Sequence, residues 1–251
     1  MCLTCGCALA PPKAHLHLTE GTTLMPVEPP PNAESLRLGI ALQAENDQRA
    51  ADNRRRFSAA GILVINLMSS PGAGKTRLLE QVLPRLAPLR CAVLEGDLET
   101  DLDAQRIRRH GIPAVQITTG GACHLDARLI EQALTHLDLQ TIDLLFIENV
   151  GNLVCPASFD LGQHHNVVLL AVTEGDDKPA KYPVMFLAAD LVLLSKVDLL
   201  PWLDDFDPDR AQSALRDLAS QAPVMAVSAK SGAGLEDWIA WIHRAHKALI
   251  S

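Results

Sequence analysis

The amino-acid sequence predicts an α/β fold, with a mostly parallel sheet and helices on both of its faces. Short continuous apolar runs alternate with polar or helical segments, which is typical of parallel strands that are buried on both faces. The first run leads directly into a Gly-rich turn and a helical segment, and two later runs lead into carboxylates. The predicted strands cover residues 62–68, 91–94, 114–117, 142–147, 167–172, 191–194 and 224–227.

Length and composition restrict the classes of function. The 251 residues, 48% of them hydrophobic, suffice for one sizeable core. No apolar run approaches the roughly 20 residues that span a bilayer, and the N-terminus lacks the basic start and apolar stretch of a signal peptide. The formal net charge of -8 disfavours nucleic acid as a partner. We therefore expect a cytoplasmic protein that binds neither nucleic acid nor membranes, and we interpret the basic runs 54–56 and 106–109 as solvated helix faces.

Residues 1–32 are predicted to be a flexible, Cys-rich, metal-binding tail that includes a Pro-rich linker. Cys2, Cys5 and Cys7 place three thiols close together, and thiolates are soft ligands that suit Zn, Cu(I) or Ni(II). A reducing cytoplasm and the crowding of these positions disfavour disulfides. His15 and His17 are either auxiliary metal ligands or solvated histidines. The linker is predicted from Pro11, Pro12, Pro26, Pro29, Pro30 and Pro31.

Residues 33–251 are predicted to form the main domain, beginning with a helix that docks on it. From Glu34 to about Phe57 the chain is rich in Leu, Ala, Glu, Gln and Arg, a composition that favours a helix. Cys91 begins a predicted strand, and we interpret it as a small buried hydrophobic residue. A last helix is expected over 235–250, with one apolar face that belongs to the core, made by Leu235, Trp238, Ile239, Ile242 and Leu249.

The Gly-rich turn after the first strand matches a P-loop, so the fold class becomes a P-loop nucleotide-binding domain. Glycines allow backbone amides to turn toward phosphate oxygens at a helix N-terminus. Lys75 would supply the point charge and Thr76 a hydroxyl for Mg²⁺. Ser69 stands where the usual motif begins with glycine. The candidate phosphate-binding residues are Gly72, Ala73, Gly74, Lys75 and Thr76.

Two acids follow predicted strands, at the edge where ligands bind in doubly wound sheets. Asp97 and Glu148 are therefore candidates, together with Thr76, for ordering Mg²⁺, and for orienting the attacking water. With Lys75 they form the predicted catalytic set. The nearby Gly151 could act as a pivot when the γ-phosphate is lost.

The segment Ser195-Lys196-Val197-Asp198 predicts the base. It is similar to the guanine-reading Asn-Lys-x-Asp motif, with a serine in place of asparagine. A carboxylate at Asp198 can accept from both N1-H and the exocyclic amine of guanine, a donor pair that adenine lacks. GTP is therefore preferred over ATP, while the shorter Ser195 predicts weaker bracing of the loop. A backbone amide from Ser228, Ala229 or Lys230 could reach guanine O6.

A second group of soft ligands is expected at Cys123, His124 and Cys155. Two thiols and an imidazole make a plausible Zn or Ni half-site, although buried cysteines and a capping histidine would give the same sequence. Cys155 follows Glu148 by seven residues, in the segment expected to respond to the γ-phosphate. A metal held there would be coupled to the nucleotide state, and by linkage the coupling is reciprocal.

Four motifs in order resemble the HypB family, GTPases that help to insert nickel into nickel–iron hydrogenase. They are Met1–Cys7, Ser70–Thr76, Gly121–Ala127 and Glu148–Pro156. The resemblance implies a SIMIBI-class G domain, related to the signal-recognition GTPases and MinD, with GTP-dependent homodimerisation. It also implies nickel at Cys2, Cys5 and Cys7, and Zn or Ni at Cys123, His124 and Cys155 near the dimer interface. The segment 173–179 is similar as well, so Lys178 or Lys181 could reach the partner's nucleotide.

The expected function is that of a slow, regulatory GTPase and nickel metallochaperone in hydrogenase maturation. Its cofactors would be GTP or GDP, Mg²⁺, Ni²⁺ and Zn²⁺. Its expected partners are a second copy in the GTP state, nickel-delivery proteins of the HypA kind and the hydrogenase large subunit. Three alternatives remain: a nickel storage or buffering protein with a vestigial P-loop, a P-loop kinase, and a GTPase for another metalloenzyme such as urease or a cobalamin enzyme.

Overall fold

The computed structural model describes residues 33–97, 101–218 and 220–251 of the chain. Within these ranges the strands form one seven-stranded sheet in the order β3-β2-β4-β1-β5-β6-β7. All neighbouring strands are parallel. The predicted fold class is therefore confirmed. The predicted metal ligands of the tail, Cys2, Cys5, Cys7, His15 and His17, lie outside the described residues.

Each predicted apolar run overlaps one strand, with bounds that differ by one to three residues in several cases. The strands are β1 (Leu63–Ser69), β2 (Cys91–Asp97), β3 (Ala114–Thr118), β4 (Leu144–Glu148), β5 (His165–Ala171), β6 (Leu191–Ser195) and β7 (Val224–Val227). The α-helices are α1 (Ala33–Ala59), α2 (Lys75–Val82), α3 (Leu102–Arg108), α4 (Ala127–Ala133), α5 (Lys178–Lys181), α6 (Pro183–Leu187), α7 (Pro208–Asp217) and α8 (Leu235–Leu249). Short 3-10 turns connect several of them, one of which covers Val197–Trp202.

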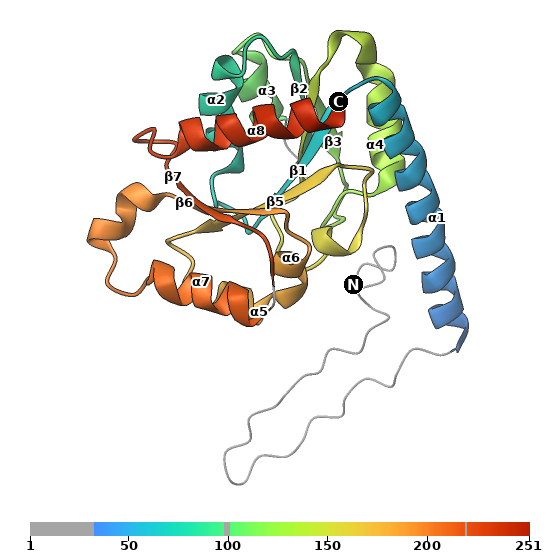
Figure 1. Cartoon of the computed structure of the whole chain (residues 1–251). Coiled ribbons are helices and arrows are strands. Elements are labelled where there is room, and N and C mark those ends of the chain that lie inside the picture. The colour runs from blue at the N-terminus through green and yellow to red at the C-terminus, as the bar shows by residue number, and fades with distance from the viewer. Residues whose placement is uncertain (1–32, 98–100, 219) are drawn as a thin grey trace.

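Helices cover both faces of the sheet (Figure 1). Successive side chains of a strand point to opposite faces, so Leu63 and Ile65 pack on the side of α2, α3 and α8. Val64 packs on the opposite side, with α1 and α4. On that same side α6 and α7 cover β5 and β6. Buried strands in the middle of three layers explain why their sequences are continuous apolar runs rather than alternating ones.

The two terminal helices pack as their sequences predict. In α8, Trp238 and Ile242 are buried in the core, and Leu249 is partly buried against it. In α1, Ala50 and Phe57 are fully buried, and the helix lies beside α4 (Figure 1). Cys91 is buried at the start of β2, and burial raises the pKa of its thiol to about 12. A thiol this hard to ionise acts as a small apolar group, as expected.

Among the described residues, the structure contains no helix with both the length and the apolar character needed to span a membrane.

Candidate nucleotide and metal sites

The P-loop connects the end of β1 to the start of α2. Gly72 has φ +77° and Gly74 has φ +100°, left-handed conformations that side chains disfavour. These two residues turn the chain so that α2 begins at Lys75 and directs its free amides toward the loop. The buried Lys75 Nζ donates to Ser69 Oγ over 3.1 Å. The serine that replaces the usual first glycine therefore holds the lysine in place.

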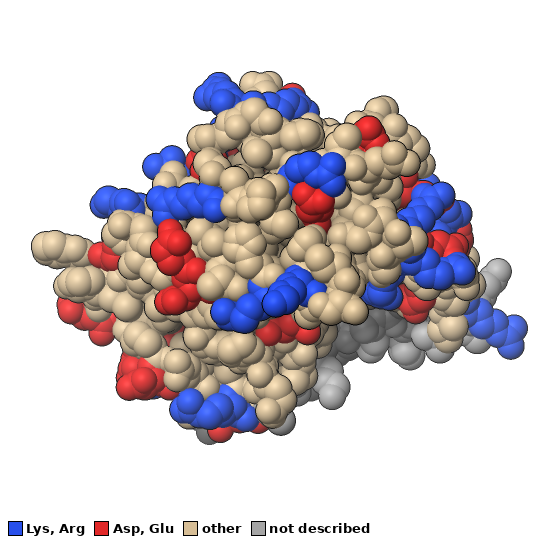
Figure 2. All heavy atoms as spheres, turned by 45° about the horizontal axis from the view of Figure 1, so that its top comes forward, with Lys and Arg blue, Asp and Glu red and all other residues tan. Residues whose placement is uncertain are grey.

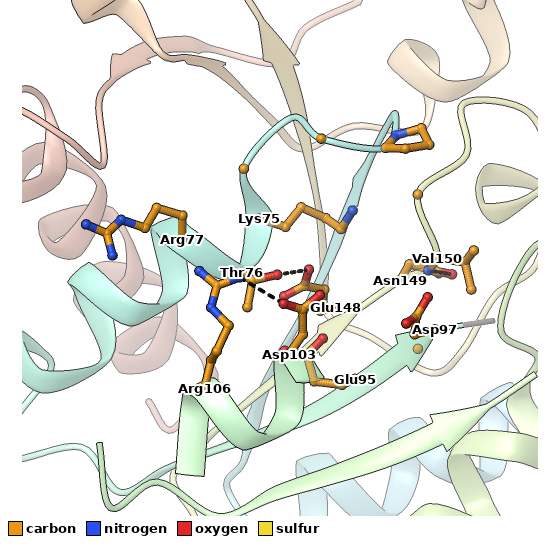
Figure 3. A pocket seen from close by; sticks show the side chains of 15 residues that line it. Lys75, Thr76, Arg77, Glu95, Asp97, Asp103, Arg106, Glu148, Asn149 and Val150 are labelled. Atoms are coloured by element: carbon orange, nitrogen blue, oxygen red, sulfur yellow. Dashed lines mark hydrogen bonds and ion pairs between the residues drawn. The ribbon is translucent and has the colours of Figure 1, made fainter. Parts of the chain in front are cut away.

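A cavity of about 370 Å³ opens beside this loop. Figure 3 shows its side chains converging from the P-loop, from the ends of β2 and β4, and from α3. It brings together the predicted residues Lys75, Thr76, Asp97 and Glu148. It also adds four charged residues that were not among the predicted site residues, Arg77, Glu95, Asp103 and Arg106.

Glu95 and Glu148 are paired neighbours on adjacent strands β2 and β4. Thr76 Oγ1 donates to Glu148 Oε1 over 2.8 Å. The other oxygen of Glu148 and one oxygen of Glu95 are buried without a hydrogen-bond partner. Mg²⁺ takes hard oxygen ligands from carboxylates, hydroxyls and phosphates. The hydroxyl and the two orphaned carboxylate oxygens therefore fit a Mg²⁺ ion beside the P-loop.

The charge state of these acids supports the same fit. Burial, with the negative charge of Glu148, raises the pKa of Glu95 well above its ordinary value. Burial also raises the pKa of Glu148, against the lowering effect of the Lys75 ammonium. Two buried carboxylates this close ionise together when a cation compensates them. The sequence signal for Glu95 was an acid inside an otherwise apolar strand.

Arg108 and Arg109 are exposed, as the interpretation of residues 106–109 as a solvated helix face expects, but Arg106 is an exception. Its guanidinium lies at the cavity wall and bonds Glu80 of α2 over 2.6 Å and Asp103 over 2.9 Å. Glu80 has a lowered pKa because the hydrogen bonds and charge of Arg106 outweigh its desolvation. Arg106 thus ties the helix after the P-loop to the helix that follows Asp97. Among the other basic residues of these runs, Arg54 is also paired, with Asp160.

A second cavity, of about 270 Å³, lies on the other side of the P-loop. Ser228 Oγ donates to Asp198 Oδ1 over 2.6 Å, while the amides of Lys230 and Ser231 donate to the same hydroxyl. Asp198 is thereby held in one orientation. The cavity is lined by Ala73, Gly74, Arg77, Leu78, Ser195, Lys196, Asp198, Leu199, Val227, Ala229 and Lys230.

Ser195 contacts the P-loop directly. Its hydroxyl donates to the carbonyl of Ala73 over 2.9 Å, in a buried position. The adjacent Lys196 adopts a left-handed conformation, with φ 60°, and its stem lies beside Gly74. The residues predicted from the guanine motif therefore form one wall of the second cavity.

The predicted soft ligands lie together. The ligand atoms of Cys123, His124 and Cys155 all lie within 4.8 Å of one another. The two sulfurs are 2.9 Å apart, and His124 stacks on Phe159 with ring centroids 3.9 Å apart. Burial lowers the pKa of His124, which favours the neutral imidazole that binds metals. Three such ligands leave one position open in a tetrahedral site, as in Zn sites that exchange a ligand.

Comparison with known proteins points to one family. The family profile "CobW/HypB/UreG, nucleotide-binding domain" matches residues 63–226. The chain is 51% identical over 239 residues to "Hydrogenase maturation factor HypB" of Azotobacter vinelandii, covering 94% of this chain and 78% of that protein. The chain belongs to the HypB family. It is also 48% identical to "Hydrogenase/urease maturation factor HypB" of Helicobacter hepaticus, over 79% of this chain and 83% of the relative.

Two solved HypB structures have the same fold. "Crystal structure of HypB from Helicobacter pylori in complex with nickel" matches with a TM-score of 0.78 and 44% identity, covering 81% of this chain and 96% of that one. The HypB structure from Archaeoglobus fulgidus matches with a TM-score of 0.75 and 37% identity, covering 81% and 99%. The P-loop domain assigned from the sequence is therefore the HypB nucleotide-binding domain.

In this HypB-family chain, residues 151 and 152 lie between two sites. One is the first cavity beside the P-loop, called the phosphate cavity below, and the other is the cluster of Cys123, His124 and Cys155. The amide of Asn152 donates to the carbonyl of Ser69 at the start of the P-loop over 2.8 Å. Its side-chain amide donates to the carbonyl of Cys123 over 3.1 Å. A Cβ at Gly151 would lie 2.8 Å from Pro71 Cα, so this glycine, predicted to be a pivot, packs directly on the P-loop.

The lysines predicted to reach a partner's nucleotide lie on α5. Lys181 pairs with Asp177, and the Lys178 ammonium lies 5.2 Å from the centre of the Tyr182 ring. Both contacts are within one chain.

Proposed function

We propose that this chain is a GTP-hydrolysing nickel metallochaperone that binds and delivers Ni(II) during maturation of nickel–iron hydrogenase. One observation carries the proposal: Asn152 bonds both the P-loop and Cys123. A change at the γ-phosphate would therefore move a residue that contacts a metal-ligand loop. The names of the relatives support hydrogenase maturation, and the nickel complex of the Helicobacter pylori protein supports the metal.

In GTP hydrolysis, the residues of the phosphate cavity would have the following roles. The P-loop residues Gly72, Ala73 and Gly74 bind phosphate oxygens through their amides, and Lys75 neutralises charge on the transferred phosphoryl group. Thr76 and Glu148, together with Glu95 and with Asp97 at the end of β2, would hold the Mg²⁺, which when bound neutralises charge on the β- and γ-phosphates. The carboxylates of Asp97 and Glu148 also orient the water in line with the γ-phosphate.

Base recognition belongs to the second cavity. Asp198 accepts from N1-H and the exocyclic amine of guanine, Lys196 covers the base, and an amide of the segment Ser228, Ala229 and Lys230 faces O6. The orientation of Asp198 by Ser228 supports selection of GTP over ATP.

The metal cargo would be held by Cys123, His124 and Cys155, with Zn(II) as the competing ion. GTP binding would favour a homodimer that forms next to this cluster, and hydrolysis would return the monomer. The coupling has to be equal in both directions, because metal and nucleotide act on the same two states.

Transfer would use the N-terminal tail. We assign Cys2, Cys5 and Cys7 to a second nickel site, connected to the 33–251 domain by the Pro-rich linker. In the cytoplasm this tail would exchange Ni(II) with proteins of the HypA kind and with the hydrogenase large subunit.

A second candidate function is nickel delivery to urease. It is favoured by the name of the Helicobacter hepaticus relative, a "Hydrogenase/urease maturation factor". The two functions share the same chemistry and differ in the recipient. Complementation of cells that lack this chain separates them, because the restored activity is that of hydrogenase or that of urease.

The proposal is tested by measuring GTP hydrolysis and dimer fraction with and without Ni²⁺ or Zn²⁺. Wild type is compared with Lys75→Ala and Cys123→Ser. Lys75→Ala is expected to lose hydrolysis and to keep metal binding, and Cys123→Ser to keep hydrolysis and lose its response to metal. If metal changes neither hydrolysis nor dimer fraction in wild type, the coupled mechanism is wrong. If the wild type binds metal and does not turn over GTP, the chain is a storage protein.

A further inference from the structure

The face of helix α1 that packs on the domain contains buried asparagines as well as apolar residues. The positions 43, 46, 50, 53 and 57 follow a spacing of three and four residues, which places them along one side of a helix. Ala50 and Phe57 fill apolar contacts, as expected for a docked helix. Asn46 and Asn53, however, are also buried, with 7% and 1% of their surface exposed. Buried amides are costly unless their donors and acceptors are paired, so their partners reveal what they do.

Asn53 joins two segments that lie far apart in the sequence. Its side-chain amide donates to the carbonyl of Ala127 over 2.9 Å and to that of Leu161 over 3.2 Å. Asn46 bridges the same two segments. Its amide donates to the carbonyl of Asp160 over 2.9 Å, and its oxygen accepts from the amide of Ala127 over 2.9 Å.

These two segments carry the thiol–imidazole cluster. Ala127 follows His124 by three residues, and Asp160 follows Cys155 by five. Phe159, from the segment that follows Cys155, stacks on the His124 ring and so joins the two segments directly. The side-chain amide of Gln43 adds a bond to the carbonyl of Ser158 over 3.1 Å. Helix α1 therefore connects the loop of Cys123 and His124 to the loop of Cys155.

Helix α1 packs closely against residues 160–162, which follow the loop of Cys155. This close packing fixes the distance between that loop and the loop of Cys123 and His124. Gly162 has φ +92°, and a Cβ there would lie 2.7 Å from both the carbonyl oxygen of Ala50 and the Cβ of Asn53. Arg54 adds two hydrogen bonds to the Asp160 carboxylate, of 2.6 and 2.7 Å. The segment that follows Cys155 is therefore in van der Waals contact with α1 and hydrogen-bonded to it.

We infer that Asn46 and Asn53 are positioning residues for the metal cluster, which α1 holds in register by bonding both ligand loops. The inference rests on the proposed metal site at Cys123, His124 and Cys155. Groups that orient metal ligands contribute to affinity because they restrict the ligands to the bound geometry.

The test uses the full chain with Cys2, Cys5 and Cys7 replaced by Ser, so that binding reports on the cluster of the main domain. Ni²⁺ is titrated in competition with a chelator, and thiolate-to-nickel charge-transfer absorption is recorded. Asn46→Ala is expected to weaken Ni²⁺ binding by about 10-fold and to shift the charge-transfer band. The matched control is Arg49→Ala, which removes the bond of α1 to Glu131 on α4 and leaves both ligand loops bonded.

The outcomes separate the two proposals. Unchanged affinity and spectrum in Asn46→Ala, with wild-type binding intact, would overturn the positioning role and leave the metal site standing. Absence of Ni²⁺ binding in the parent would overturn the metal site itself. Equal weakening in Arg49→Ala would show that general docking of α1, rather than the two amides, sets the affinity. If Asn46→Ala fails to fold, the isosteric Asn46→Asp is measured instead. It keeps the acceptor for the Ala127 amide and loses the donor to the Asp160 carbonyl, and an unchanged affinity and band there also overturn the inference.

Discussion

At the scale of single residues, Ser228 shows how a side chain can act through another. It does not have to touch the nucleotide, because its hydroxyl donates to the carboxylate of Asp198, the residue that we propose to read guanine. Hydrogen bonds to charged groups contribute about 1.5–3 kcal/mol. We expect Ser228→Ala to raise the KM or Kd for GTP by about 10-fold or more, with little change in kcat.

The control for this prediction lies three residues further on. Ser231→Ala removes a hydroxyl from the same loop, one that accepts from the Ala233 amide. GTP affinity should stay near the wild-type value in that variant. Equal losses of affinity in both variants, measured by fluorescence with a labelled GTP, would mean that loop order rather than the orientation of Asp198 is responsible.

His164 predicts how stability depends on pH. Its Nδ1 accepts from the Val64 amide over 3.0 Å, which requires a neutral ring nitrogen. Burial, followed by the charges of His165 and Arg54, lowers its pKa to about 4 from an ordinary 6.5. Between these values the unfolded chain binds a proton that the folded chain excludes. The free energy of unfolding therefore falls as the pH drops from about 6.5 to 4.

This dependence is measured by urea unfolding at pH 7, 5.5 and 4.5, for wild type and for His164→Gln. The variant cannot take up the proton, so the difference in stability between pH 7 and 4.5 should be smaller than in wild type. Parallel curves for the two proteins would show that other groups cause the acid sensitivity.

At the scale of elements, the docking of α1 depends on close approach at Gly162. An alanine there would meet Ala50 and Asn53 at 2.7 Å and would have to adopt φ +92°. Overpacking costs about 1–3 kcal/mol, and the left-handed conformation about 1–2 kcal/mol. We expect Gly162→Ala to lower the free energy of unfolding by the sum of both, about 2–5 kcal/mol.

Gly111→Ala is the matched control. Gly111 also has a positive φ, +74°, but a Cβ there would meet no atom within 4 Å. The free energy of unfolding of Gly111→Ala should fall by only about 1–2 kcal/mol, measured in the same thermal or chemical unfolding experiment. If the two variants lose equal stability, α1 is not packed as tightly as described.

The sequence predicted these elements well where local patterns determine them. Strands such as β4 and β5 are continuous apolar runs between layers, so their type and approximate bounds were visible. The P-loop was visible because its glycines and lysine have fixed spacing. The amide face of α1 was not predicted, since Asn46 and Asn53 look like surface residues until their partners at Ala127 and Leu161 are known.

At the scale of the whole molecule, the same limit applies to the two cavities. Parallel strands end at one edge of a sheet, so the convergence of Asp97 and Glu148 could be predicted from the topology. The charged network of Glu80, Asp103 and Arg106 depends on how α2 and α3 pack, which no local pattern encodes. Bridging contacts such as those of Asn152 follow from loop paths that require the folded structure.

The last prediction concerns the predicted boundary between the metal-binding tail, residues 1–32, and the main domain, residues 33–251. The two cavities beside the P-loop and the cluster at Cys123, His124 and Cys155 all lie within the described residues. Deleting residues 1–31 should therefore leave the rate of GTP hydrolysis unchanged. The number of Ni²⁺ ions bound per chain should fall, because the three thiols of the tail are removed.

Hydrolysis and nickel stoichiometry are measured on the truncated chain, on the full chain, and on a full chain with Cys2, Cys5 and Cys7 changed to Ser. The truncated and triple-serine chains should bind the same reduced amount of Ni²⁺, because the deletion and the substitutions remove the same ligands. A lower value in the truncated chain would add His15 and His17 to the ligand set. Loss of hydrolysis in the truncated chain alone would show that the tail takes part in the nucleotide reaction, and the proposed division between transfer and switching would then be wrong.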